Sequence, residues 1–133
     1  MSDGGGVDRM GWSAVHRAAV VGDVDGVRVA LAAGGDPNGV DAAGWRPLHF
    51  AAQARSAQVA ALLLEAGAEV DAVDGQGNTP LWRAVFNYRG DPQVLAVLRA
   101  AGADVDRANV HGVSPRLLAE RIANYDVAVH VTT

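Results

Sequence analysis

The sequence predicts an all-α fold, a short solenoid of helix-turn-helix units joined by β-turn or hairpin fingers. The first observation is a ladder of glycines at intervals of 33, 33 and 35 residues: Gly11, Gly44, Gly77 and Gly112. A second ladder, at intervals of 33 and 35 residues, consists of Gly34, Gly67 and Gly102. A third ladder stands three residues ahead of the first and consists of Asp8, Asp41, Asp74 and Asn109. Three coincident ladders indicate a repeat protein, in which each unit buries its apolar face against its neighbours.

The first helix of each unit is predicted to begin where a hydroxyl or a proline precedes an apolar run. Thr79-Pro80 and Ser114-Pro115 combine an N-cap hydroxyl with a proline at the first helical position, where the missing N–H has no cost. Arg46-Pro47 keeps only the proline, and Ser13-Ala14 keeps only the cap, so these two starts are weaker. Ala18-Ala19, Ala51-Ala52 and Ala84-Val85 follow on these helices, and their small side chains allow neighbouring helices to approach closely.

The second helix of each unit is predicted to begin near Asp23, Ser56 or Asp91-Pro92. It ends at the second glycine ladder, where glycine can take the left-handed conformation after the last turn. Bulky apolar residues recur along these helices at the spacing of a buried stripe. In the third unit two extra residues fall within 86–90, which predicts an irregular bulge between its two helices.

The composition excludes several classes of protein. The chain has 133 residues, 50% of them hydrophobic, and a formal net charge of −4, which fits one compact domain with its own core. It has no cysteine, which excludes disulfides and cysteine-ligated zinc, and no lysine, which excludes a Walker-type phosphate loop. The acidic balance and the lack of a basic run disfavour nucleic-acid binding. No signal peptide or long apolar run is present, so we expect a cytoplasmic protein without membrane contact.

Two runs of the second unit resemble the signature of the ankyrin-repeat family. They are Arg-Pro-Leu-His-Phe-Ala-Ala at residues 46–52 and Gly-Ala-Glu-Val-Asp-Ala at residues 67–72. The corresponding runs of the third and first units are similar to the same signature: residues 77–84 with 102–106, and residues 12–19 with 34–38. From Val113 onward the likeness covers one helix and part of another, which implies a truncated last repeat that caps the stack.

The resemblance implies a single ankyrin-repeat domain over residues 8–133, preceded by a flexible leader at residues 1–7. Its full repeats span about 8–40, 41–73 and 74–108, and a partial repeat spans 109–133. Finger turns are expected on one side of the stack, around residues 38–45, 71–78 and 104–113. We expect the protein to be a monomer.

No pattern of residues indicates a catalytic or metal site. His16 and His49 stand at the same position of successive units, but Trp82 stands at the third. In the family this histidine hydrogen-bonds to the start of its own helix and to the adjoining turn, so a structural role is expected. The serines are better explained as helix caps than as nucleophiles. We therefore expect no enzymatic activity, no metal and no cofactor.

Function is then expected to come from a surface that binds a partner protein. Trp12 and Trp45 follow glycines of the first ladder, where a finger passes into its helix, and are candidate anchors. The bulge adds residues of the types enriched at interface hot spots: Phe86, Tyr88 and Arg89. Positions that often face the concave groove in the family add polar candidates: Arg9, Gln53, Asn78, Asn87, His111 and Arg121.

Packing is the alternative role for the aromatic candidates. Trp12 can cover the open end of the stack, Phe86 can fill a gap beneath the bulge, and Trp45 and Tyr88 can support neighbouring helices. Phe50 is expected to lie in the core.

The leading hypothesis is a non-enzymatic protein–protein interaction module that binds a partner protein on its concave and finger surface. The alternative is an immunity or inhibitor protein that occludes a toxin or effector enzyme. Residues 111–115 with 119–126 resemble compact bacterial ankyrin proteins, some of which are encoded beside toxins or secreted effectors. The acidic charge would also steer association with a basic nuclease.

Overall fold

The computed structural model describes residues 7–122 and 125–131. These residues form eight helices and no strand, which confirms the predicted all-α fold. Of the leader predicted at residues 1–7, all but Val7 lies outside the described residues. In chain order the helices are α1 (Ala14–Val20), α2 (Val24–Ala32), α3 (Pro47–Gln53), α4 (Ala57–Glu65), α5 (Pro80–Phe86), α6 (Gln93–Ala100), α7 (Pro115–Arg121) and α8 (Tyr125–Val129).

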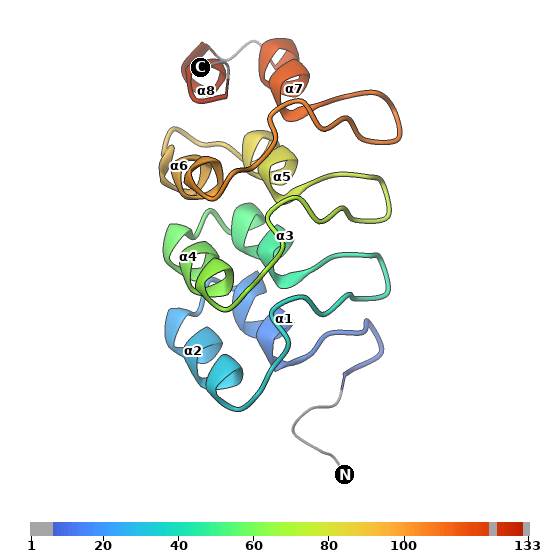
Figure 1. The fold of residues 1–133 in the computed structure, drawn as a ribbon, viewed down its shortest axis with the longest axis vertical. Helices are drawn as coiled ribbons and strands as arrows, with labels where there is room; N and C mark the ends of the chain where they lie inside the picture. Colours follow the sequence, from blue (N-terminus) through green and yellow to red (C-terminus); the bar gives the residue numbers. More distant parts are fainter. Residues whose placement is uncertain (1–6, 123–124, 132–133) are drawn as a thin grey trace.

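The helices pair into four units, here numbered 1 to 4, that stack along one axis (Figure 1). The first helices α1, α3, α5 and α7 contact one another in order, and α2, α4 and α6 form a second column beside them. The finger turns all project to the same side, away from the second column. Units 1 and 4 lie at the two ends, so each has a neighbouring unit on one side only.

The first helices begin at the capping residues that the sequence indicated. Thr79 Oγ1 accepts a hydrogen bond from the Trp82 N–H at 3.1 Å, and Ser114 Oγ accepts one from the Leu117 N–H at 3.1 Å. Arg46 supplies no side-chain cap to α3, although a proline follows it as the first helical residue. The local signals of capping and proline therefore set these boundaries.

The second helices also follow the predicted signals at most of their ends. Asp23 caps α2 and Ser56 caps α4 through side-chain oxygens, whereas α6 begins after Pro92 without a side-chain cap. Each of these helices is followed by a glycine with a positive φ, at 92°, 101° and 95° for Gly34, Gly67 and Gly102. Only glycine takes this conformation without strain, which explains the second ladder.

The core lies between the two helix columns. The first helices contribute alanines that are fully buried where neighbouring helices approach: Ala19, Ala51, Ala52 and Ala84. The second helices contribute larger side chains that fill the space between the columns: Val27, Val59, Leu63, Leu95 and Leu98. Each buried leucine contributes about 2 kcal/mol, so the stack depends on these interior positions.

The linker of unit 3 contains the two extra residues. It spans 87–92, three residues more than the linkers of units 1 and 2 at 21–23 and 54–56, because α6 is also one residue shorter than α2 and α4. Within it Tyr88 turns inward and is only 7% exposed, while Arg89 is exposed. The predicted bulge is therefore present, with a buried aromatic side chain beneath it.

Successive finger turns are joined by backbone hydrogen bonds. The Ala42 N–H donates to the carbonyl oxygen of Met10 at 2.8 Å. The next two pairs repeat this bond, from Gly75 N–H to Ala43 O at 3.1 Å and from Val110 N–H to Gln76 O at 3.0 Å. The four fingers therefore form a continuous ladder beside the helices.

The first glycine ladder makes this close approach possible. Gly44 has a φ of 84°, and a Cβ added to it would lie 2.6 Å from the backbone nitrogen of Gly75 in the next finger. Gly11 and Gly77 have the same constraint against Ala42 and Val110, at 2.9 and 3.0 Å. Gly112 has a φ of 77°, but a Cβ there would meet nothing within 4 Å, because no described finger follows it. Three of the four glycines are thus required by contact as well as by conformation.

We expect Gly44→Ala to lower the free energy of unfolding by about 3 kcal/mol or more, because it adds a backbone clash to the strain of positive φ. Gly112→Ala is the matched control and should lower it by only about 1–2 kcal/mol, the cost of the conformation alone. Urea unfolding followed by circular dichroism measures both. Equal losses in the two variants would contradict the proposed contact between fingers.

Candidate functional site

Each finger turn is closed by its residue of the third ladder, which consists of Asp8, Asp41, Asp74 and Asn109. In all four fingers one side-chain oxygen of the ladder residue accepts hydrogen bonds from the backbone N–H groups two and four residues later, at distances between 2.7 and 3.0 Å. In the first finger the bond from the Trp12 N–H lowers the pKa of Asp8 below its ordinary value. A short acceptor side chain at this position therefore fixes the finger turn.

The remaining atom of each ladder side chain has a different partner. Asp74 lies against Arg83, whose Nε and Nη2 both donate to Asp74 Oδ2, at 3.3 and 3.0 Å. In unit 2 the position equivalent to Arg83 is Phe50, whose side chain has no donor, and Asp41 Oδ2 instead accepts from Trp12 Nε1 at 2.8 Å. In the last finger Asn109 uses its amide nitrogen to donate to Asn78 Oδ1 at 2.9 Å. Asn78 Oδ1 is an acceptor, so its partner must donate. The amide of Asn109 can donate, whereas an ionised aspartate cannot.

Two histidines, His16 and His49, bind units 1 and 2 to the finger that follows each of them. The Arg46 N–H donates to His49 Nδ1 at 3.1 Å, and His49 Nε2 donates to the carbonyl oxygen of Asn78 at 2.8 Å. His16 makes the same pair of bonds with Ser13 N–H and Trp45 O, at 3.1 and 3.2 Å. Burial lowers the pKa of His49 below its ordinary value of 6.5, and the Arg83 and Arg46 charges lower it further. The lowered pKa favours the neutral form of the His49 ring, and both rings hydrogen-bond to the next finger.

The side chains beside the fingers form one continuous row, here called the aromatic strip. Its members are Trp12, Phe50, Trp45, Arg83, Trp82 and Phe86. The ring centroids of Trp12 and Trp45 lie 5.3 and 4.7 Å from that of Phe50. The strip therefore begins in unit 1 and continues through unit 2.

Arg83 continues the strip into unit 3. Its guanidinium carbon lies 4.3 Å from the ring centroid of Trp45 and 5.4 Å from that of Trp82. Trp82 in turn stacks on Phe86, at 5.5 Å between centroids and 18° between planes. The three tryptophans are half-buried, and Phe86 is 55% exposed. Planar groups from three units thus share one surface that remains accessible at several points.

The strip contains three of the residues predicted for binding: Trp12, Trp45 and Phe86. It does not contain Asn78, which is 4% exposed and hydrogen-bonded within the finger ladder. Tyr88 is buried in the core beside the ring of His130, with centroids 6.3 Å apart. Asn78 and Tyr88 are therefore both buried within the repeat stack.

The other predicted residues stand apart from the strip or beside its end. Asn87 ends α5 and donates from Nδ2 to the carbonyl oxygen of Arg83 at 2.9 Å. Gln53 is exposed at the end of α3, the position equivalent to Phe86 in unit 3. The remaining predicted residues are exposed at separate places, on the first finger, the bulge, the last finger and α7: Arg9, Arg89, His111 and Arg121.

The sequence reasoning missed three members of the strip: Phe50, Trp82 and Arg83. Phe50 and Arg83 lie 33 residues apart and hold the same repeat position, so the repeat itself could have placed them on one face. Phe50 is buried as expected, yet its ring also supports both Trp12 and Trp45. Trp82 was assigned only as an interruption of the histidine pattern, although its ring joins Arg83 to Phe86.

Comparison with known families identifies the repeat. A family model described as ankyrin repeats, in three copies, matches residues 15–109. The chain belongs to the ankyrin-repeat family. A search of curated proteins found no match. Ankyrin repeats are generally protein–protein interaction modules and generally not enzymes.

Two further observations concern the chemistry of this ankyrin-repeat protein. The residues that the structure describes contain no group of three or more His, Cys, Asp or Glu side chains that could hold a metal ion. Within the same residues, no helix is long and apolar enough to cross a bilayer. The aromatic strip, which joins planar side chains of three units, is the candidate functional site.

We expect Asp74→Asn to lower the free energy of unfolding by about 2–4 kcal/mol, because it breaks a buried ion pair and leaves Arg83 without its counter-charge. The Asp74 side chain is 0% exposed and that of Arg83 18%. Asp106→Asn is the control: its partner Arg116 is at 2.7 Å, but both side chains are more exposed, and stability should stay close to wild type. Chemical unfolding of both variants makes the comparison. A stable Asp74→Asn protein would show that the pair does not hold the strip.

The lowered pKa of His49 predicts a loss of stability in mild acid. Above pH 6.5 the ring is neutral in both the folded and the unfolded chain, so its stabilising bonds are fully present. As the pH falls below 6.5 the unfolded chain takes up the proton first, and stability falls until the folded pKa is reached. An NMR titration of the His49 ring should give a midpoint below 6.5. A midpoint at or above that value would contradict the burial of a neutral ring.

Proposed function

We propose that this ankyrin-repeat protein binds a partner protein through the aromatic strip. The observation that carries the proposal is the continuity of the strip, with half-buried tryptophans along it and the exposed Phe86 at its end. An exposed phenylalanine stacked on a tryptophan contributes little to the core. Its apolar area is available to a partner, and burial of such area favours association.

The residue types of the strip also suit recognition. Tryptophan and arginine are enriched among the residues that contribute most to binding energy at interfaces. Arg83 is already held in place by Asp74 on its edge and by Trp45 on its face. The Arg83 side chain would therefore lose little conformational entropy when a partner binds, which favours affinity.

The backbone around the strip is also fixed before binding. The finger turns beside it are closed by Asp41 and Asp74 and joined by backbone hydrogen bonds. Surfaces of this kind change little when a partner binds. We therefore expect the partner to dock on a largely preformed surface that extends over units 1 to 3.

A narrower form of the proposal makes the protein an inhibitor of a toxic enzyme. The net charge of −4 favours a basic partner, since opposite charges accelerate association. Co-expression with the product of a neighbouring gene tests it: rescue of the cells supports inhibition. Failure of rescue leaves binding through the strip in place but excludes that enzyme as the target.

We expect Phe86→Ala to weaken partner binding by about tenfold or more, because a hot-spot aromatic typically contributes more than about 1.4 kcal/mol. Partners captured by the wild-type protein from cells that express it would be identified by mass spectrometry. Their affinity for each variant would then be measured by calorimetry. The fold should be unaffected, with a change in unfolding free energy below about 1 kcal/mol, because the side chain is largely exposed.

Val29→Ala is the matched control. Val29 is 69% exposed on α2, in the second helix column and away from the strip, so its truncation should leave the affinity unchanged. Equal affinities of all three proteins would show that the partner docks elsewhere.

A further inference from the structure

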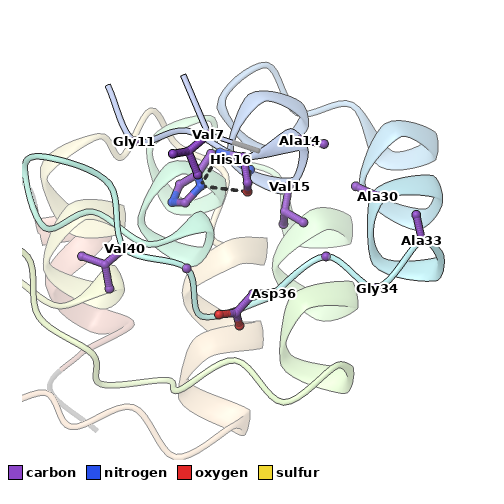
Figure 2. A pocket seen from close by; sticks show the side chains of 13 residues that line it. Val7, Gly11, Ala14, Val15, His16, Ala30, Ala33, Gly34, Asp36 and Val40 are labelled. Carbon is purple, nitrogen blue, oxygen red and sulfur yellow. Dashed lines mark hydrogen bonds between the residues drawn. The ribbon is translucent and has the colours of Figure 1, made fainter. Parts of the chain in front are cut away.

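Unit 1 contains a cavity of about 480 Å³, separate from the aromatic strip (Figure 2). Its walls come from the start of α1, the end of α2 and the turn at residues 34–36, and Val7 and Val40 stand at its sides. Pockets that bind small molecules in proteins typically have volumes of about 300–1,000 Å³. The cavity is therefore large enough for a ligand.

The cavity arises from side chains that are smaller in unit 1 than at the same repeat positions elsewhere. Val15 stands where units 2 and 3 have the fully buried Leu48 and Leu81. Ala30 stands where they have the fully buried Leu63 and Leu98, and Gly35 where they have Ala68 and Ala103. The volume missing at these positions lies at the wall of the cavity. This space is therefore a feature of the first repeat, and units 2 and 3 fill it with larger side chains.

The chain takes up only part of the missing volume. The backbone of Gly35 lies so close to α1 that a Cβ added there would be 2.6 Å from Val15 Cγ2. The turn thus closes directly onto Val15, with no room for a larger residue. The rest of the space remains open between Ala30, Ala33 and Val40.

The lining is mostly apolar, and its polar side chains are Ser13, His16 and Asp36. His16 contributes ring atoms, but both of its nitrogens already have partners in Ser13 and Trp45. Asp36 is the charged residue of the lining, and it is exposed. Its Oδ1 accepts from the Asn38 N–H at 2.8 Å. An apolar body would contact the walls while a carboxylate faces one end of the bound molecule.

We propose that this cavity binds a small molecule with an apolar body and one cationic group. The apolar walls supply the affinity by burial, and Asp36 sets the preference for a cation over an anion. The overall charge of −4 acts in the same direction. The site shares no residue with the aromatic strip, so its failure would leave the proposed function untouched.

The test compares two probes with the same aromatic body, 1-naphthylmethylamine and 1-naphthylacetate, in NMR titrations of the ¹⁵N-labelled full-length chain. The amine should give saturable shifts at the amides of residues 30–40, and the acetate should bind at least about fivefold more weakly. Asp36→Asn keeps the Oδ1 acceptor for Asn38 and should bring the two affinities together.

Ala30→Leu restores the side chain that units 2 and 3 carry at this position. It should abolish binding of the amine and raise the thermal midpoint by about 3–6 °C, because it fills apolar space. Ala32→Leu adds the same atoms at an exposed position of α2 and should leave binding intact. The NMR spectrum of each variant shows directly whether it is folded.

Three results would overturn the proposal. One is the absence of saturable shifts with the amine at millimolar concentration. Another is unchanged amine binding in folded Ala30→Leu, which would place the probe elsewhere. The third is self-association of the wild-type chain that Ala30→Leu removes, because it would assign the cavity to a second copy of the protein.

Discussion

The close approach of neighbouring finger turns sets the geometry of the whole molecule. Each finger after the first donates one backbone N–H to the finger before it, at 2.8 to 3.1 Å, and this close approach leaves no room for a side chain at Gly11, Gly44 and Gly77. The ladder aspartate or asparagine closes each turn so that this N–H is presented at the required place. Because the contact recurs once per unit, the helix pairs recur at the same spacing. The period of about 33 residues in the sequence is therefore the length of chain needed to return to this contact.

The fold could be predicted from the sequence because its signals are local. Capping hydroxyls, prolines at the first helical position and glycines after the last turn each act within a few residues, and the repeat shows them several times. The candidate site was harder to predict because its residues depend on contacts between units. Asn78 was expected on the surface, but the amide of Asn109 in the next finger covers it. Trp45 was correctly placed beside a finger, yet its contact with Arg83 requires the relative position of α3 and α5. The cavity of unit 1 was also hard to predict. It depends on side-chain volumes that are smaller in unit 1, and this difference is visible only when equivalent positions of the repeats are compared.

In unit 3 a tryptophan of the aromatic strip replaces the histidine that binds a helix to the next finger. At the position of His16 and His49 this unit carries Trp82, so the hydrogen bond from the helix to the next finger is missing there. The Trp82 Nε1 is buried and has no acceptor among the residues that the structure describes. Such a donor costs about 1–3 kcal/mol, which the packing of the repeat alone does not explain. What the tryptophan supplies is the link between Arg83 and Phe86. Locally unfavourable residues of this kind are expected where a protein carries out its function.

Unit 1 has smaller interior side chains than units 2 and 3, and this affects the strip as well as the cavity. The stability of a repeat array is a sum of unit terms and interfaces between neighbours, so an end unit with smaller interior side chains has less to hold it in place. Trp12 belongs to this unit and is fixed by Asp41 and Phe50 of the next. A molecule bound in the cavity would stabilise the folded form of unit 1 by mass action. It would thereby also secure Trp12 at the N-terminal end of the aromatic strip. The cavity and the aromatic strip have no residue in common, but both depend on the stability of the helix pair α1 and α2.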